Sequence, residues 1–172
     1  TKGSSAGTQT QSSVFGGQTA PGFTDAHEQY NGTSWTETTE INTARYANAG
    51  AGTYTSALCP IGVNPSTTRV NNNERWDGSA WTEVGDVNSP RRGGGGTGAS
   101  NTNAVIFGGG ESDSPPVTQS AKTEKWDGSS WTESGDMSTG RDSQASCGLT
   151  TAAITMGGNV PPRTDATEEY DG

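Results

Sequence analysis

The chain has 172 residues, of which 27% are hydrophobic, and it contains 26 Gly but only 8 Pro. Its 19 acidic residues outnumber its 10 Lys and Arg, so the net charge is −9. Such an acidic surface repels phosphate groups, which excludes nucleic acid and anionic membranes as expected partners. No apolar run approaches the roughly 20 residues of a membrane-spanning helix.

Low apolar content is also typical of disorder, but here aromatic residues and short apolar runs recur at a regular spacing, which indicates a folded repeat. In chain order we place four repeats at 1–40, 41–86, 87–136 and 137–172. The same residue types return in the same order about every 45–50 residues, as in stacked supersecondary units. These landmarks are Arg45, Arg91 and Arg141; Gly16, Gly17, Gly62, Gly108, Gly109, Gly157 and Gly158; Tyr30, Trp76, Trp126 and Tyr170; and Trp35, Trp81 and Trp131.

The third repeat shows the elements of one unit in chain order. A segment of small residues, RGGGGTG at 92–98, is followed by an apolar stretch, AVIF at 104–107, which ends at a Gly pair. After a variable polar loop come two short strands, TEKW at 123–126 and SWTE at 130–133, joined by a tight turn at Asp-Gly. We expect four antiparallel strands per repeat, with the small-residue segment innermost because strands are most crowded near the axis of a ring of sheets.

The order of these residues resembles the kelch repeat. The matching segments are PRR at 90–92, VIFGG at 105–109, EKWDG at 124–128 and then Trp131. The resemblance implies an all-β fold of kelch-type β-propeller blades, each a four-stranded antiparallel sheet, in a ring of about five to eight blades. The repeats depart from it where Ile61 precedes Gly62 and where Trp replaces the usual Tyr in two units.

The richness in Gly, Ser, Thr and Asn is similar to kelch-like arrays of marine bacteria and of phage tail and surface proteins. The fourth repeat stops inside its turn, at Gly172, so its outer strand is missing from the sequence. We therefore expect this chain to be part of a larger propeller.

The recurring charged residues are expected to be structural, because an active site needs one constellation of unlike residues and not one copy per repeat. Each recurring arginine presents a planar fork that can hold a carboxylate or the backbone carbonyls of a neighbouring blade. An anion-binding ring of arginines around a channel is the alternative. The glutamates in register, Glu74, Glu124 and Glu168, either pair with these arginines or face solvent.

Two further expectations concern residues that often act in sites. The Trp pairs of the second and third repeats are expected to pack between blades, with stacking on sugars as the alternative. The single histidine, His27, is expected to be a solvated loop residue. It cannot supply the two histidines of the copper centre found in some kelch oxidases, and no zinc-ligand spacing occurs. The sequence thus predicts no cofactor, no metal and no enzyme activity.

The two cysteines and one sequon have simple interpretations. Cys59 and Cys147 occupy different places in their repeats, so we expect two free, buried thiols, with one disulfide as the alternative. Asn31-Gly32-Thr33 matches a glycosylation sequon, but it occupies the turn that Asp-Gly fills elsewhere, so the turn explains it.

Function is expected to lie in the variable loops, placed at 18–27, 63–73, 110–122 and 159–167, which would cluster on one face. The longest loop supplies the candidate binding residues Glu111, Asp113, Pro115 and Pro116. The sequence therefore predicts a non-enzymatic structural and binding module of a virion appendage or a secreted surface protein. Its partners would be other protein chains, including copies of itself, or a surface glycan. The alternatives are a secreted glycan-active propeller enzyme and a purely architectural subunit of a filament or assembly.

Overall fold

The computed structural model describes residues 2–20, 22–112 and 118–172. Every regular secondary-structure element in these ranges is a β-strand, and the strands form four antiparallel sheets. The predicted all-β fold class is therefore confirmed. None of the described segments forms a helix that could span a membrane.

Each sheet is a simple meander of consecutive strands, and each lies inside one of the expected repeats. Sheet 1 contains β1 (Ser4–Gly7), β2 (Ser12–Gln18), β3 (Phe23–Tyr30) and β4 (Trp35–Thr38). Sheet 2 contains β5 (Ala51–Thr53), β6 (Ser56–Val63), β7 (Arg69–Trp76) and β8 (Trp81–Val84). Sheet 3 contains β9 (Gly95–Ser100), β10 (Asn103–Phe107), β11 (Thr123–Trp126) and β12 (Trp131–Glu133). Sheet 4 contains β13 (Ala145–Leu149), β14 (Ala152–Met156) and β15 (Thr167–Tyr170).

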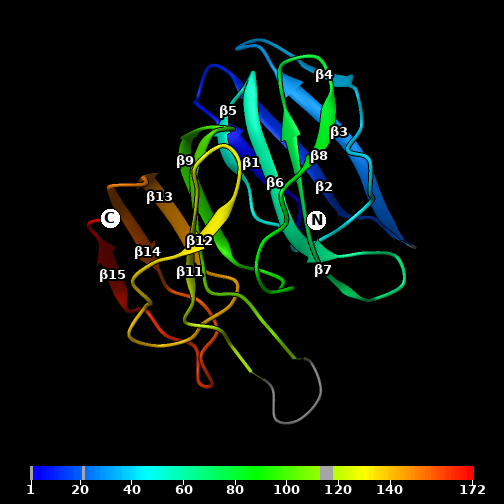
Figure 1. The fold of residues 1–172 in the computed structure, drawn as a ribbon. Coiled ribbons are helices and arrows are strands. Elements are labelled where there is room, and N and C mark those ends of the chain that lie inside the picture. Colours follow the sequence, from blue (N-terminus) through cyan, green and yellow to red (C-terminus); the bar gives the residue numbers. More distant parts are fainter. Residues whose placement is uncertain (1, 21, 113–117) are drawn as a thin grey trace.

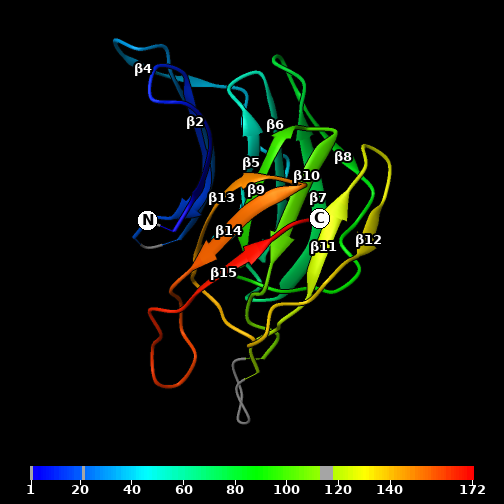
Figure 2. The same ribbon diagram turned by 90° about the vertical axis from the view of Figure 1, so that its left-hand side faces the viewer.

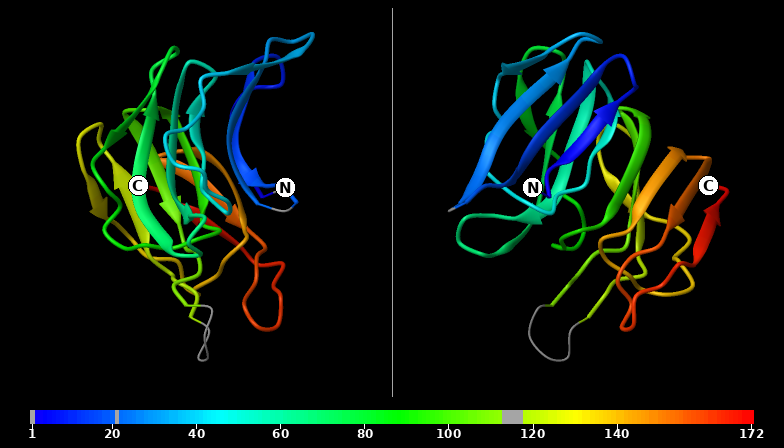
Figure 3. Two further views of the ribbon diagram at one scale, coloured as in Figure 1. Left: turned by 90° about the vertical axis from the view of Figure 1, so that its right-hand side faces the viewer. Right: turned by 180° about the vertical axis from the view of Figure 1, so that it is seen from behind.

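The sheets follow one another in chain order, with sheets 1 and 4 at the two ends of the series (Figure 1 and Figure 3). Their first strands converge, since β5 contacts both β1 and β9, and β9 contacts β13. The crowding explains the small residues: a Cβ on Gly96 would lie 2.7 Å from the carbonyl oxygen of Gly50. The prediction that the small-residue segments supply the crowded first strand is confirmed.

The outer hairpins turn through four residues, as at 77–80 between Trp76 and Trp81. Only the glycine of each turn takes a positive φ, 101° at Gly78. The aspartate or asparagine before it accepts hydrogen bonds. Asp77 Oδ1 accepts the backbone N–H groups of Ser79 and Ala80, each at 2.9 Å. In the third repeat the same bonds lower the pKa of Asp127 to about 2. Asn31 Oδ1 does the same in the first repeat, which confirms that the sequon residue belongs to a turn.

Two of the predicted variable loops are mostly strand, so their boundaries were wrong. β2 and β3 leave only residues 19–22 between them, and β6 and β7 leave only 64–68. The hairpins continue past the Gly pair because a local register shift accommodates it, between Phe15 and Gly17 in sheet 1 and between Pro60 and Gly62 in sheet 2. All four connections still leave the sheets at one end, the lower end in Figure 1.

The apolar core is divided among the boundaries between neighbouring sheets. One cluster joins sheets 1 and 2, one joins sheets 2 and 3, and one joins sheets 3 and 4. The largest members at these boundaries are Phe15, Trp76 and Trp81; Leu58, Ile61, Trp126 and Trp131; and Phe107, Met137 and Tyr170. The stability of the fold therefore depends on contacts between sheets.

Candidate functional site

The recurring arginines are buried, and each forms an ion pair with the glutamate on the third strand of its own sheet. In sheet 2, Arg45 Nη2 lies 2.6 Å from Glu74 Oε1, and both side chains are fully buried. Arg91 forms the same fully buried pair with Glu124, and Arg141 pairs with Glu168, whose side chain is 20% exposed. The Nη1 atom of each arginine also donates to backbone carbonyls of its own sheet, such as that of Asn72 at 2.8 Å from Arg45.

The second oxygen of each glutamate holds the chain that enters the sheet. Glu74 Oε2 accepts the backbone N–H of Asn42 at 2.6 Å and its side-chain amide at 2.9 Å. Glu124 binds Asn88 in the same two ways. Burial lowers the pKa of Arg91, and the adjacent Glu124 carboxylate opposes this shift. These charges are committed to the fold, so the alternative that faces the glutamates toward solvent is wrong.

The expectation that the guanidinium would hold a neighbouring blade needs a correction. The side chain binds its own sheet, whereas the main-chain carbonyl of the same arginine binds the preceding sheet. In sheets 1 to 3, a glycine N–H donates to this carbonyl, from the second glycine of the Gly pair or from the glycine of Ile61-Gly62: Gly17 to Arg45 at 2.7 Å, Gly62 to Arg91 at 3.0 Å and Gly109 to Arg141 at 2.8 Å. The glycine is needed because φ is positive there, 128° at Gly17.

A second series of peptide hydrogen bonds crosses all four sheets. Ala47 N–H donates to Lys2 at 2.8 Å, Gly93 N–H to Ala47 at 2.6 Å and Ser143 N–H to Gly93 at 2.6 Å. These four residues stand at equivalent positions, and all have positive φ angles, between 50° and 95°. We call this series the peptide ladder.

Beside the peptide ladder, the converging first strands line an open groove formed by two adjoining cavities of about 390 and 350 Å³. Residues from all four sheets line both cavities, which share Ser5, Gly50, Gly96 and Ser146. Lys2 is the one charged side chain among the residues that line either cavity. The three buried arginines are not among them, so the anion-binding ring of arginines that was the alternative is wrong.

The aromatic pairs across the outer hairpins stack at an angle. The ring centroids are 5.5 Å apart for Trp76 and Trp81 and 5.4 Å apart for Trp126 and Trp131. These four indoles are at most 6% exposed, and each pair packs on the preceding sheet. The predicted packing between sheets is confirmed, and stacking of these pairs on sugars is excluded. Trp35 differs, because it is 50% exposed.

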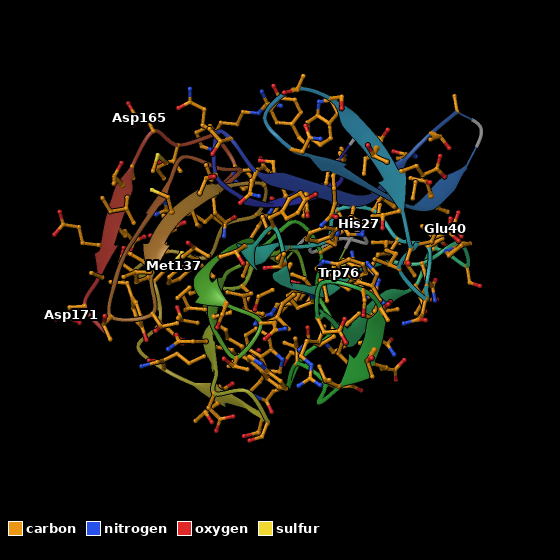
Figure 4. All side chains as sticks on the ribbon, turned by 90° about the horizontal axis from the view of Figure 1, so that it is seen from above. His27, Glu40, Trp76, Met137, Asp165 and Asp171 are labelled. Atoms are coloured by element: carbon orange, nitrogen blue, oxygen red, sulfur yellow. The ribbon has the colours of Figure 1, made fainter. Side chains whose placement is uncertain are left out.

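His27 is not the solvated loop residue that we expected. It lies within β3, is fully buried, and contacts Trp76 and Trp81 edge to face across the boundary between sheets 1 and 2 (Figure 4). Two groups compete for Nδ1: the Thr39 carbonyl at 3.2 Å, which needs a proton there, and the Trp81 N–H at 3.1 Å, which needs a lone pair. One feature of the sequence could have indicated that His27 does not share the environment of the glutamates. Glu28 is in register with the glutamates of the ion pairs, so strand alternation places His27 on the opposite face of its strand.

Burial lowers the pKa of His27, and its Nε2 has no hydrogen-bond partner among the described residues. The unfolded chain, with a histidine pKa of about 6.5, takes up the proton first as pH falls, so acid favours unfolding. We expect the free energy of unfolding to fall between pH 7.5 and 5, and to fall less in His27→Gln. Urea unfolding at both pH values measures this difference, and an equal loss in both proteins would contradict it. Because the chain has one histidine, no other imidazole contributes.

Both cysteines are free, as expected, but only Cys59 is buried; Cys147 is exposed on β13, so its predicted burial was wrong. Desolvation raises the pKa of Cys59 to about 11. The thiolate is the reactive form, so a dilute native sample should react with an aromatic disulfide reagent at one thiol within minutes and at the second only after unfolding. Cys147→Ser should remove the fast phase. A fast phase that survives this change would show that Cys59 is accessible.

Of the four candidate binding residues, the structure describes Glu111, whereas Asp113, Pro115 and Pro116 lie outside the described residues. Glu111 is exposed, and its backbone N–H donates to the Thr118 carbonyl at 2.9 Å, which closes the base of the connection. Gly110 anchors that base, because its carbonyl accepts Arg69 Nε of sheet 2 at 3.0 Å. The longest connection therefore has a fixed stem.

The described residues contain no group of three or more His, Cys, Asp and Glu that could hold a metal ion. The fold and the site together define an all-β chain of repeated antiparallel sheets, with ion pairs inside the repeats and main-chain hydrogen bonds between neighbouring sheets. Comparison with models of known protein families and with curated proteins gives no match.

Proposed function

We propose that this chain is a non-enzymatic structural and binding module, a kelch-type β-propeller or part of one, on a virion appendage or a secreted surface protein. It binds protein or glycan through the connections at one end of the sheets. The observation that carries the proposal is that the recurring residues and the variable connections have different roles. The residues that recur stabilise each sheet and join it to its neighbour, whereas the connections at one end differ from repeat to repeat.

The physical support is rigidity beneath a variable surface. The stem of the longest connection is closed by Glu111 and Thr118 and is anchored to sheet 2 through Arg69. A stem that is fixed before binding reduces the ordering cost of association, which favours affinity. Binding groups on loops above a rigid scaffold are a common arrangement in proteins.

The test replaces residues 112–117 with Asn-Gly and measures binding to an array of bacterial surface polysaccharides and to intact bacterial cells. The control variant replaces the opposite-end turn Asp77–Ala80 with Asn-Gly-Thr-Ser, the turn of the first repeat. We expect at least a tenfold loss of binding in the first variant and none in the control, with both melting as the wild type does. Binding that survives the first change, or that is lost equally in both, would contradict the role of this connection.

A further inference from the structure

Among the described residues, no sheet covers two of the sheet faces, one at each end of the series. The first, which we call the leading face, is the side of sheet 1 turned away from sheet 2. Phe15 packs toward sheet 2, so its strand neighbour Val14 lies on the leading face. Tyr30 and Trp35 pair across the hairpin there, with ring centroids 5.3 Å apart and Trp35 50% exposed.

The second, which we call the trailing face, is the side of sheet 4 turned away from sheet 3 (Figure 2). Ala153 and Tyr170 pack toward sheet 3, so the alternate positions of β13 and β14 lie on the trailing face. Three cross-strand pairs form this patch, and every member is apolar: Ala145 with Met156, Cys147 with Ile154, and Leu149 with Ala152. Leu149 is 52% exposed and Met156 is 36% exposed. Contiguous apolar patches of this kind mark interaction sites.

The two faces match the two halves of a contact that the chain already makes. At the boundary of sheets 2 and 3, the tilted pair Trp126 and Trp131 covers the aliphatic face of the preceding sheet, with Leu58 and Ile61. Tyr30 and Trp35 have a similar tilted geometry, 36° against 41° between ring planes, but none of the four described sheets covers them. The trailing face offers the aliphatic half and has no aromatic pair upon it.

The main-chain hydrogen-bonding groups at the two ends of the series are also complementary. In the peptide ladder each N–H donates to the carbonyl of the equivalent residue one sheet earlier, and the last residue is Ser143. The Ser143 carbonyl has no peptide donor among the described residues. Lys2 occupies the equivalent position in sheet 1, so its N–H is the donor that continues the series.

We propose that the leading face of one copy of this chain docks on the trailing face of a second copy, head to tail. Trp35 and Tyr30 cover Leu149, Ile154 and Met156, and Lys2 N–H donates to Ser143 of the other copy. The occupant is a second copy because the contact continues a boundary already built between the sheets. Such a heterologous contact uses different patches on the two copies. The proposal uses other surfaces than the proposed function and does not depend on it.

Charge opposes this contact and gives it a salt dependence. Glu28 and Glu37 flank the aromatic pair on the leading face, Glu169 pairs with Ile154 on the trailing face, and the chain carries a net charge of −9. Salt screens repulsion between exposed charges, with a Debye length of about 10 Å at 0.1 M and about 3 Å at 1 M. Association is therefore stronger at high salt.

The test is sedimentation velocity of the 172-residue chain and of two variants with one altered face each, Trp35→Glu and Leu149→Glu. The wild type should associate as concentration and salt rise. Each variant alone should stay monomeric, and an equimolar mixture should form dimers and nothing larger, because one intact leading face and one intact trailing face remain. Both changed residues are about half exposed, so the variants should melt close to the wild type. Trp35→Phe should associate as the wild type does.

Three outcomes would overturn the proposal. The wild type could stay monomeric at every concentration and salt. A single variant could form dimers alone, which would mean like faces meet. Cys147, on the trailing face, could be protected from thiol reagents while the chain sediments as a monomer, which would mean that the chain covers its own trailing face.

Discussion

Arg91→Met is expected to lower the free energy of unfolding by about 3–5 kcal/mol, because removing one partner of a buried ion pair leaves the other charge uncompensated. Arg91 and Glu124 are both fully buried. The change also leaves the carbonyls of Gly108 and Lys122 without the guanidinium donor. Urea unfolding followed by tryptophan fluorescence measures the loss, since Trp126 and Trp131 lie at this boundary.

Two variants separate the ion pair from charge in general. Arg163→Met removes an exposed arginine, and it should change the free energy of unfolding by less than about 0.5 kcal/mol. Arg91→Met combined with Glu124→Leu should recover part of the loss, because no lone charge remains buried. Equal effects of Arg91→Met and Arg163→Met would show that the buried pair does not hold the sheet.

Trp131→Ala is expected to cost about 3–5 kcal/mol, the range for emptying a buried tryptophan site. Trp131 is 6% exposed and packs on sheet 2, with Leu58 and Ile61 in the same cluster. Thermal and urea unfolding at a protein concentration low enough to keep the chain monomeric measure the loss.

The chain carries its own matched control for this change. Trp35 stands at the same place in the first repeat and has the same cross-hairpin partner geometry, but it is half exposed. Trp35→Ala should therefore cost less than about 1 kcal/mol in the monomer, because little area is buried there. A similar loss in both variants would place the stabilisation within each hairpin and not between sheets.

Much of the fold was predictable because each landmark repeats in register. Asp-Gly between two aromatic residues indicates a hairpin wherever it occurs, and three near copies place the hairpins at equivalent positions. The small residues that lead into β5, β9 and β13 and continue within them indicated a crowded strand, for the steric reason that Gly96 and Gly50 show. Local chemistry and repetition agreed, so the sheets could be placed.

The burial of individual side chains was harder to predict, because it depends on which face of a strand packs against a neighbouring sheet. His27 stands in a polar segment, FTDAHEQY, so its composition suggested solvent, yet the strand turns it toward Trp76 and Trp81. Cys147 lies among residues as small as those of the buried strands, but it faces away from sheet 3 and is exposed. Composition alone does not distinguish the two faces of a strand.

The candidate site was predictable only in outline. The repetition of the arginines indicated that they have a structural role. However, the bond to the preceding sheet is made by a main-chain carbonyl, which no side-chain pattern reveals. Conversely, the Gly pair was a visible signal, because its second glycine supplies the N–H that this carbonyl accepts. The connections differ in sequence from repeat to repeat, so repetition carries no information about what they bind.

The claim that consecutive sheets are joined by the arginine main chain is tested most directly by amide hydrogen exchange, measured by NMR in a dilute sample. The N–H groups of Gly62 and Gly109 donate to the carbonyls of Arg91 and Arg141, so they should exchange only on global unfolding. Gly158 stands at the equivalent place in sheet 4 and has no such carbonyl among the described residues, so its N–H should exchange orders of magnitude faster. Exchange of Gly62 and Gly109 at the rate of Gly158 would contradict the account.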